Sequence, residues 1–217
     1  MKLLVATRSE HKLGEIREIL APLGEIELVG LHEVELPPDP PDDELEPFDT
    51  FEANALSKAR WYAAHAGLPT VADDSGLEVD ALDQAPGVFT KRFAPGDFEG
   101  AARDRANNRY LLERLAGVPA VGRTARYVCV VSFVAAPGSE AQEEAQGLTF
   151  RASVEGVITE TPQGEGGFGY DPLFFVPALG CTFAQASSAQ KHELSHRGQA
   201  FRAFAEHFGA QGEEGPQ

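Results

Sequence analysis

The sequence has few cysteines and few basic residues. Only two cysteines, Cys129 and Cys181, occur among 217 residues, and their spacing matches no zinc-finger pattern. Two thiols of this kind are typical of a reduced, cytosolic chain. The 18 Lys and Arg residues are outnumbered by 34 Asp and Glu residues, which gives a formal net charge of −16. Because an acidic surface repels the phosphate backbone, this balance argues against a nucleic-acid-coating protein.

Long hydrophobic runs are also absent. The apolar segment at residues 3–6 is too short for a signal peptide, and no later run approaches the roughly 20 residues that a membrane span requires. We therefore expect a cytoplasmic protein without a membrane partner. With 42% hydrophobic residues the chain can still bury a substantial core, as one domain or as two lobes. Any anionic ligand must be met by a local cluster of Lys and Arg.

Hydrophobic periodicity predicts a chain in which strands and helices are mixed. Apolar residues at helical spacing predict helices over residues 10–23, 50–67, 101–115 and 198–208. Apolar runs predict strands over residues 2–6, 68–72, 124–135 and 147–159. The last two strands flank a turn sequence at residues 137–140, as in a hairpin. The fold class is therefore α/β with some antiparallel pairing.

Two segments carry weak structural signals. Residues 37–47 are acidic and rich in proline, which indicates the least structured part of the chain, either a flexible link or a lid. Residues 209–217 are expected to form a frayed tail.

Two adjacent carboxylates, Asp73 and Asp74, follow the apolar run that ends at Ala72. A strand that delivers two acids into a turn can hold a hard cation such as Mg²⁺ against phosphate oxygens. Asp-Asp-Ser-Gly is also a good turn sequence, and taken alone the pair favours turn chemistry. At the first strand-helix junction, residues 7–12 leave the amide groups of a helix N-terminus free, which makes an anion site.

Six motifs follow one another along the chain. They are Ala-Thr-x-x-x-x-Lys at 6–12, Thr-Phe-x-x-Asn-Ala-x-x-Lys-Ala at 50–59, Ala-Asp-Asp-Ser-Gly-Leu at 72–77, Ala-Pro-Gly at 85–87, Gly-Gly-Phe-Gly-Tyr-Asp-Pro-x-Phe at 166–174 and Lys-x-x-x-Ser-His-Arg-Gly at 191–198. In this order they resemble the inosine triphosphate pyrophosphatase family. The resemblance covers nearly the whole chain, and the last two motifs are highly specific.

The resemblance implies a fold and a reaction. The implied fold is an elongated, two-lobed α/β structure with a long mixed β-sheet and a central cleft, over residues 1–208, assembled as a homodimer. The implied reaction is Mg²⁺-dependent hydrolysis of non-standard purine nucleoside triphosphates (dITP, ITP and XTP) to the monophosphate and pyrophosphate. This activity removes them from the nucleotide pool.

The resemblance also assigns roles to residues of this sequence. Asp74 is the catalytic general base and, with Glu46, a metal ligand. A carboxylate beside a second carboxylate and a cation can be held ionised near neutral pH, as a base requires. The substrate-binding residues are Thr7, Arg8, Ser9, Glu10, His11, Lys12, Lys58, Ser75, Phe168, Gly169, Tyr170, Asp171, Lys191, His196 and Arg197.

The chemistry of the substrate explains these residue types. A triphosphate carries about four negative charges, so fixed cations such as Lys12, Lys58, Lys191 and Arg197 stabilise its transition state. Phe168 offers a flat face to any purine, and hydrogen bonds to the ring edge then select the base. Hypoxanthine and xanthine carry an oxygen where adenine carries an amino group, so donors aimed at that oxygen reject ATP.

The chain departs from the family pattern in its first loop, where Arg8 and Ser9 replace a glycine and an asparagine. Two rival functions also follow from the sequence. Residues 192–196 read His-Glu-Leu-Ser-His, the signature in which two histidines one helical turn apart bind zinc in a peptidase. A nucleotide-binding module without turnover is the third reading, although the pairing of Glu46 and Asp74 with Lys58 argues against it.

Overall fold

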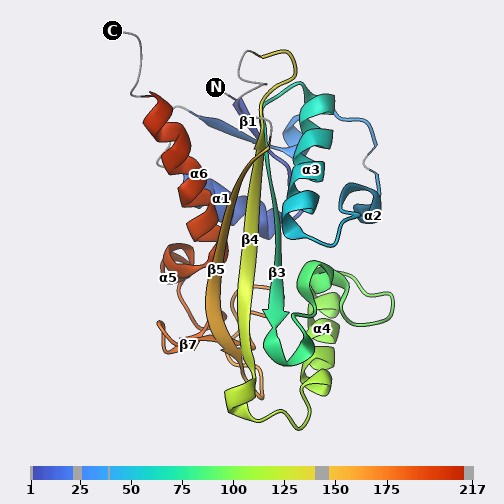
Figure 1. The fold of residues 1–217 in the computed structure, drawn as a ribbon, viewed down its shortest axis with the longest axis vertical. Helices are drawn as coiled ribbons and strands as arrows, with labels where there is room; N and C mark the ends of the chain where they lie inside the picture. Colours follow the sequence, from blue (N-terminus) through green and yellow to red (C-terminus); the bar gives the residue numbers. More distant parts are fainter. Residues whose placement is uncertain (1, 22–25, 39, 140–146, 213–217) are drawn as a thin grey trace. The chain divides into compact units, whose positions relative to one another are not determined.

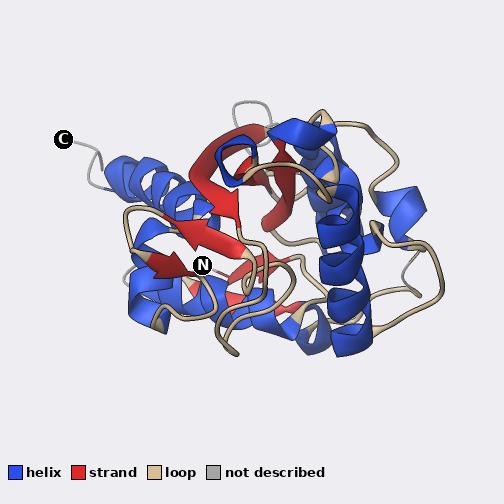
Figure 2. Ribbon diagram, turned by 90° about the horizontal axis from the view of Figure 1, so that it is seen from below, coloured by secondary structure: helices blue, strands red, loops and turns tan. Residues whose placement is uncertain are grey.

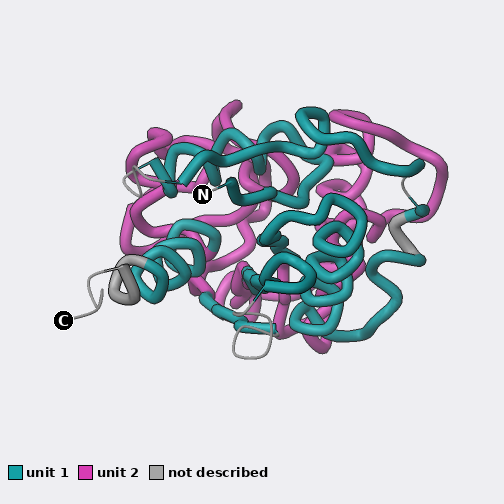
Figure 3. The backbone as a smooth tube through the Cα atoms, turned by 90° about the horizontal axis from the view of Figure 1, so that it is seen from above, with its two compact units in different colours: residues 1–74, 129–152, 197–217 teal, residues 75–128, 153–196 magenta. Residues whose placement is uncertain are grey.

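The computed structural model describes residues 2–21, 26–38, 40–139 and 147–212. Helices and strands are mixed along the chain (Figure 2), and seven strands form one sheet in the order β2-β1-β3-β4-β5-β6-β7. The chain divides into two compact units (Figure 3): residues 1–74, 129–152 and 197–217 form unit 1, and residues 75–128 and 153–196 form unit 2. No helix within the described ranges has the length and apolar character of a membrane span.

Unit 1 begins with a parallel arrangement of strands. Strand β1 (Lys2–Val5) pairs in parallel with β2 (Glu27–Gly30) on one side and with β3 (Thr70–Val79) on the other, with Leu4 opposite Thr70. Its helices are α1 (Glu10–Leu20), α2 (Asp42–Leu45), α3 (Phe51–Ala66) and most of α6 (His196–Gly212). Figure 1 labels these helices and the strands β1 and β3.

The two faces of the sheet in unit 1 are covered by different helices (Figure 1). On one face, Val71 of β3 packs in a core with Ile16 of α1 and Phe201 of α6. On the other face, Ala72 packs with Tyr62 of α3 and Leu45 of α2. Because successive side chains of a strand point to opposite faces, each residue of β3 is assigned to one helix layer or the other.

Unit 2 contains α4 (Gly100–Arg114), α5 (Ser188–Leu194) and the short antiparallel strands β6 (Phe174–Val176) and β7 (Cys181–Thr182). Its core includes Leu111 of α4, Tyr127 and Phe174. Strands β4 (Thr124–Val134) and β5 (Leu148–Ile158) contribute residues to both units, as β3 does.

Most predicted elements are confirmed within a few residues. Helix α3 is bounded by the Thr50 cap, whose hydroxyl accepts from the amide of Ala53, and by Gly67, whose positive φ of 65° ends the helix. Helix α6 continues to Gly212, so the predicted tail is helical over its first four residues, and residues 213–217 lie outside the described part. The predicted ends at residue 23 and at the turn residue 140 also fall on residues that are not described.

Two predictions are wrong. The strand predicted over residues 68–72 does not end in a turn at the two aspartates, because β3 continues through them to Val79. The segment 37–47, predicted as a flexible link or a lid, instead contains the helical turn α2 and contributes Leu45 to the core. In both places a tertiary contact overrides the local turn preference.

Candidate active site

The continuation of β3 separates the two aspartates. Asp73 follows Val71 on the α1 and α6 face of the sheet, and Asp74 follows Ala72 on the α3 face. Both are largely buried, with 1% and 8% of their surface exposed. They therefore meet different partners and cannot act as an adjacent pair on one ion.

Asp74 lies among three polar side chains of unit 1. The amide of Asn54 donates to its carboxylate Oδ2 at 3.2 Å, and the ammonium of Lys58 forms an ion pair with Glu46. Asn54 and Lys58 are four residues apart on α3, so they lie on the same helical face. Glu46 and Lys58 both act electrostatically on Asp74. The arrangement brings together Asp74, Glu46 and Lys58, the residues to which the family resemblance assigns roles.

The position of Glu46 follows from the packing of the segment around it. Leu45 anchors α2 in the core, and the Asn54 side chain holds the segment from the other end. The Oδ1 atom of Asn54 accepts from the Phe48 amide at 2.8 Å, and its Nδ2 donates to the Phe48 carbonyl at 3.0 Å. Asn54 thus fixes both the loop that carries Glu46 and the carboxylate of Asp74.

The electrostatics of this group favour a proton acceptor that works near neutral pH. Burial raises the pKa of Asp74 to about 6, with Lys58 opposing the rise and the charge of Glu46 adding to it. Burial lowers the pKa of Lys58, but Glu46 and Asp74 outweigh this and raise it. Lys58 is therefore a fixed cation beside a carboxyl group that changes its charge near physiological pH.

The opposite face of β3 holds a compact cationic cluster. Lys12 Nζ contacts Asp73 Oδ2 at 3.0 Å, and the guanidinium of Arg197 lies 3.5 Å from the same oxygen and 2.5 Å from Glu15. Burial raises the pKa of Asp73, but Lys12 and Arg197 prevail and lower it, so Asp73 stays ionised. The thiol of Cys129 also points at Asp73, at 3.9 Å. Lys12 and Arg197, predicted to contact substrate, here neutralise a buried carboxylate.

The first loop is ordered by its own hydroxyl groups. Ser9 caps α1 by accepting from the amide of Lys12, and the hydroxyl of Thr7 accepts from the amide of Ser9. Arg8, which replaces the family glycine, donates to the carbonyl of Pro40 at 2.7 Å. Glu10 and His11 form the first turn of α1 and are exposed. The substituted loop therefore keeps the N-terminus of α1 in place, although the two hydroxyls occupy amide groups that an anion would otherwise bind.

In unit 2 the glycine cluster carries a second polar group. Lys191 and Asp171 are buried and form an ion pair at 2.8 Å. The same Asp171 oxygen accepts from the amide of Phe168 at 3.0 Å, and Lys191 lies 4.8 Å from the Phe168 ring centroid. A side chain at Gly167 would place its Cβ 2.0 Å from this carboxylate, so only glycine fits there. The structure thus brings Phe168, Asp171 and Lys191 together.

The neighbouring residues of this segment are tied to other parts of unit 2. The hydroxyl of Tyr170 donates to the carbonyl of Thr90 at 2.8 Å, and burial raises the pKa of Tyr170. The ring of His196 stacks on Tyr127 with centroids 4.7 Å apart. Ser75, the first residue of unit 2, is half-buried on β3.

The structure contradicts the zinc-peptidase hypothesis. Helix α5 ends at Leu194, and Ser195 has extended backbone angles, so His192 and His196 belong to different helices. The geometry of that signature needs both histidines on one turn of one helix. In the described part of the chain, no group of three or more His, Cys, Asp and Glu side chains is arranged to bind a metal ion.

Several residues of these groups were not singled out from the sequence. Asn54 stood in a motif, and its spacing of four from Lys58 was the available signal. Glu15, Cys129 and Tyr127 carry no local signal, because their partners are far away in the sequence.

Comparisons with known proteins agree on one family. The model of the Ham1 family matches residues 3–207. A dITP/XTP pyrophosphatase of Exiguobacterium sp. is 47% identical over 203 residues, which cover 93% of this chain and 94% of that protein. A dITP/XTP pyrophosphatase of Thermus thermophilus is 46% identical over 206 residues, covering 95% and 91%. The solved HAM1 protein of Coxiella burnetii is 33% identical, with a TM-score of 0.82 and coverage of 97% and 99%.

Proposed function

Because this chain belongs to the Ham1 family, we propose that it hydrolyses dITP, ITP and XTP to the nucleoside monophosphate and pyrophosphate. Relatives about 45% identical over most of the chain are named dITP/XTP pyrophosphatases, which supports this substrate class. The observation that carries the proposal is the buried Asp74, held beside Lys58 and Glu46 with a pKa of about 6. A protein that only binds nucleotides has no use for such a proton acceptor.

The residues around Asp74 fit a magnesium ion. Glu46 and Asp74 are two carboxylates whose negative charges repel each other, because Glu46 raises the pKa of Asp74. A cation between them would relieve this repulsion. Mg²⁺ in proteins is commonly held by one or two carboxylates plus substrate phosphates, so further protein ligands are not required. When bound, the ion would neutralise charge that develops on the phosphate oxygens.

The residues of this chain account for the remaining chemistry. Asp74 accepts the proton that the attacking water loses, the anhydride between the α and β phosphates opens, and pyrophosphate leaves. Lys58 is held in place by Glu46 and supplies positive charge without reorganisation during the reaction. Asn54 fixes the Asp74 carboxylate through the bond to Oδ2. The leaving group is expected to be bound by the capped start of α1.

Base recognition is assigned to unit 2. The Phe168 ring is expected to stack on the purine, and donors around it select the exocyclic oxygen that replaces the amino group of adenine. Asp171 holds this segment by accepting from the Phe168 amide, and Lys191 contacts the Phe168 ring and pairs with Asp171. We also propose a cytoplasmic location, as the sequence analysis expects, and a homodimer, as the family resemblance implies.

The proposal is tested with ITP and Mg²⁺ by measuring pyrophosphate release. Asp74→Asn removes the proton acceptor, so turnover should fall by about 10³-fold. Glu52→Gln is the control, because Glu52 is a carboxylate on helix α3, which also carries Lys58, and pairs with the exposed Arg151. Wild-type protein that binds ITP but releases no pyrophosphate at any Mg²⁺ concentration would refute the proposal. Equal release by wild type and Asp74→Asn would refute the assignment of the base.

A further inference from the structure

Gly169 is held at both of its backbone polar groups by one helix. Its amide donates to Asp104 Oδ2 at 2.9 Å, and its carbonyl accepts from Asn108 Nδ2 at 2.8 Å. Asp104 and Asn108 are four residues apart on α4, so both side chains project from the same helical face. All three residues belong to unit 2.

These two bonds fix the peptide planes on either side of Gly169. The amide belongs to the plane shared with Phe168, and the carbonyl belongs to the plane shared with Tyr170. Gly169 itself has a φ of 61°, in the left-handed region, although an added Cβ would meet nothing closer than 4.0 Å. Glycine is therefore required here for its backbone conformation, and the bonds from α4 stabilise that conformation.

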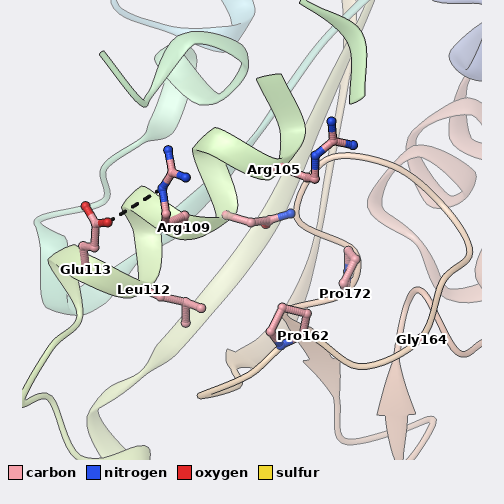
Figure 4. A pocket seen from close by; sticks show the side chains of 8 residues that line it. Arg105, Arg109, Leu112, Glu113, Pro162, Gly164 and Pro172 are labelled. Atoms are coloured by element: carbon pink, nitrogen blue, oxygen red, sulfur yellow. Dashed lines mark ion pairs between the residues drawn. The ribbon is translucent and has the colours of Figure 1, made fainter. Parts of the chain in front are cut away.

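Packing does not hold the segment against the helix along its whole length. A cavity of about 570 Å³ is lined by α4 residues, among them Arg105, Arg109 and Leu112, and by Pro162 and Pro172 of the glycine-rich segment (Figure 4). Asn108 also lines this open pocket, so beside it the hydrogen bonds to Gly169 contribute to the register of the two elements. The bond to the Asp104 carboxylate is charge-assisted and is the stronger of the two.

We propose that Asp104 and Asn108 are positioning residues that set base selectivity by orienting the Phe168–Tyr170 backbone against the purine. This inference rests on the proposed function for the identity of the base-binding segment. The proposed function places the reacting phosphates near Asp74, and Asp104 and Asn108 bond to the backbone of Gly169 instead. Each therefore acts through Gly169. Loss of either tie should therefore weaken the choice between bases and leave the chemical step intact.

The test compares nucleotide binding by variants at these positions. The Kd values of IMP and AMP are measured by titration calorimetry, and kcat and KM are measured for ITP and ATP. Asp104→Ala should lower the preference for the inosine nucleotide about tenfold, and Asn108→Ala about threefold, as expected for a charged and a neutral hydrogen bond. The kcat for ITP should stay within about threefold of wild type, since the chemical step is untouched.

Two controls separate positioning from general stability. Asp104→Asn keeps an oxygen that accepts from the Gly169 amide, so it should restore most of the preference. Arg109→Ala lies on the same helix and removes only a pair with Glu113 at 3.8 Å, so it should leave the preference unchanged. Thermal unfolding of every variant verifies that it is folded.

Two outcomes would overturn the inference. In the first, Asp104→Ala weakens IMP and AMP binding equally, which is the result of a purely structural role. In the second, the wild type binds IMP and AMP with equal Kd. Because the readout is binding, it decides the inference even if no triphosphate is hydrolysed, which would refute the proposed function alone.

Discussion

Asp73 and Asp74 are neighbours in the sequence, yet the two faces of β3 give them opposite properties. Asp73 is surrounded by Lys12 and Arg197, which lower its pKa against the effect of burial. Asp74 is buried beside the carboxylate of Glu46, and burial raises its pKa to about 6 against the opposing effects of Lys58 and Lys12. A single residue step along a strand thus separates a permanent structural anion from a group that can take up a proton.

The largest expected effect comes from removing the anion on the first face. Asp73→Asn leaves Arg197 and Lys12 buried or half-buried without their main counter-charge. The free energy of unfolding should fall by about 3–5 kcal/mol, as for other broken buried pairs. Chemical denaturation at pH 8 measures it. The matched control is Asp74→Asn on the opposite face, which should not be destabilised, and equal losses in both variants would contradict the comparison.

The second prediction concerns the pH dependence of stability in metal-free protein. Asp74 has a raised pKa, so its contribution is complete below about pH 4 and is lost as the pH rises through about 6. Relative to Asp74→Asn, the wild type should therefore lose about 2–3 kcal/mol between pH 4 and pH 8. Asp73 has a lowered pKa, so its contribution is present above about pH 4 and is lost as the pH falls.

Chemical denaturation in EDTA at a series of pH values measures how the free energy of unfolding changes with pH, and so checks the predictions for both aspartates. A difference between wild type and Asp74→Asn that does not change from pH 4 to pH 8 would show that Asp74 is not perturbed.

The smallest effect is expected at the residue that supports Asp74. Asn54→Ala removes two bonds to the Phe48 backbone and one to Asp74. Stability should fall by about 1–2 kcal/mol, and the pKa of Asp74 should rise further, because the bond from Asn54 lowers it. Arg60→Ala, an exposed change on the same helix, should stay within about 0.5 kcal/mol. An upward shift in the pKa of the Asp74 carboxyl distinguishes the loss of this hydrogen bond from a general loss of stability.

The elements that the sequence predicted well are those with local signals. Thr50, the helical spacing of apolar residues and Gly67 define α3 within the chain itself, and the structure confirms both ends. The short strands β2 and β7 were missed, since two to four residues hold too little periodicity to detect. The end of β3 was misplaced because Asp, Ser and Gly favour turns, and only distant partners reverse that preference.

The candidate site likewise contains residues that the sequence indicates and residues that it does not. Two of the motifs contain Lys58 and Asp74, the family resemblance adds Glu46, and the structure brings these three together. The pairing of Arg197 with Glu15 spans 182 positions, and no pattern within a window of residues could indicate it. The opposite orientation of the two aspartates would have followed from strand alternation, had the strand been extended past Ala72.

The division of the chain into units has a consequence for experiments on fragments. Unit 1 is built from three separate stretches of sequence and unit 2 from two. The polypeptide passes from one to the other inside β3, β4 and β5 and after the first residue of α6. No shortened version of the gene therefore encodes either unit as an uninterrupted polypeptide. To study one unit alone, its segments must be joined in a new order with new linkers. A protease cut between β4 and β5 would divide both units between the two fragments.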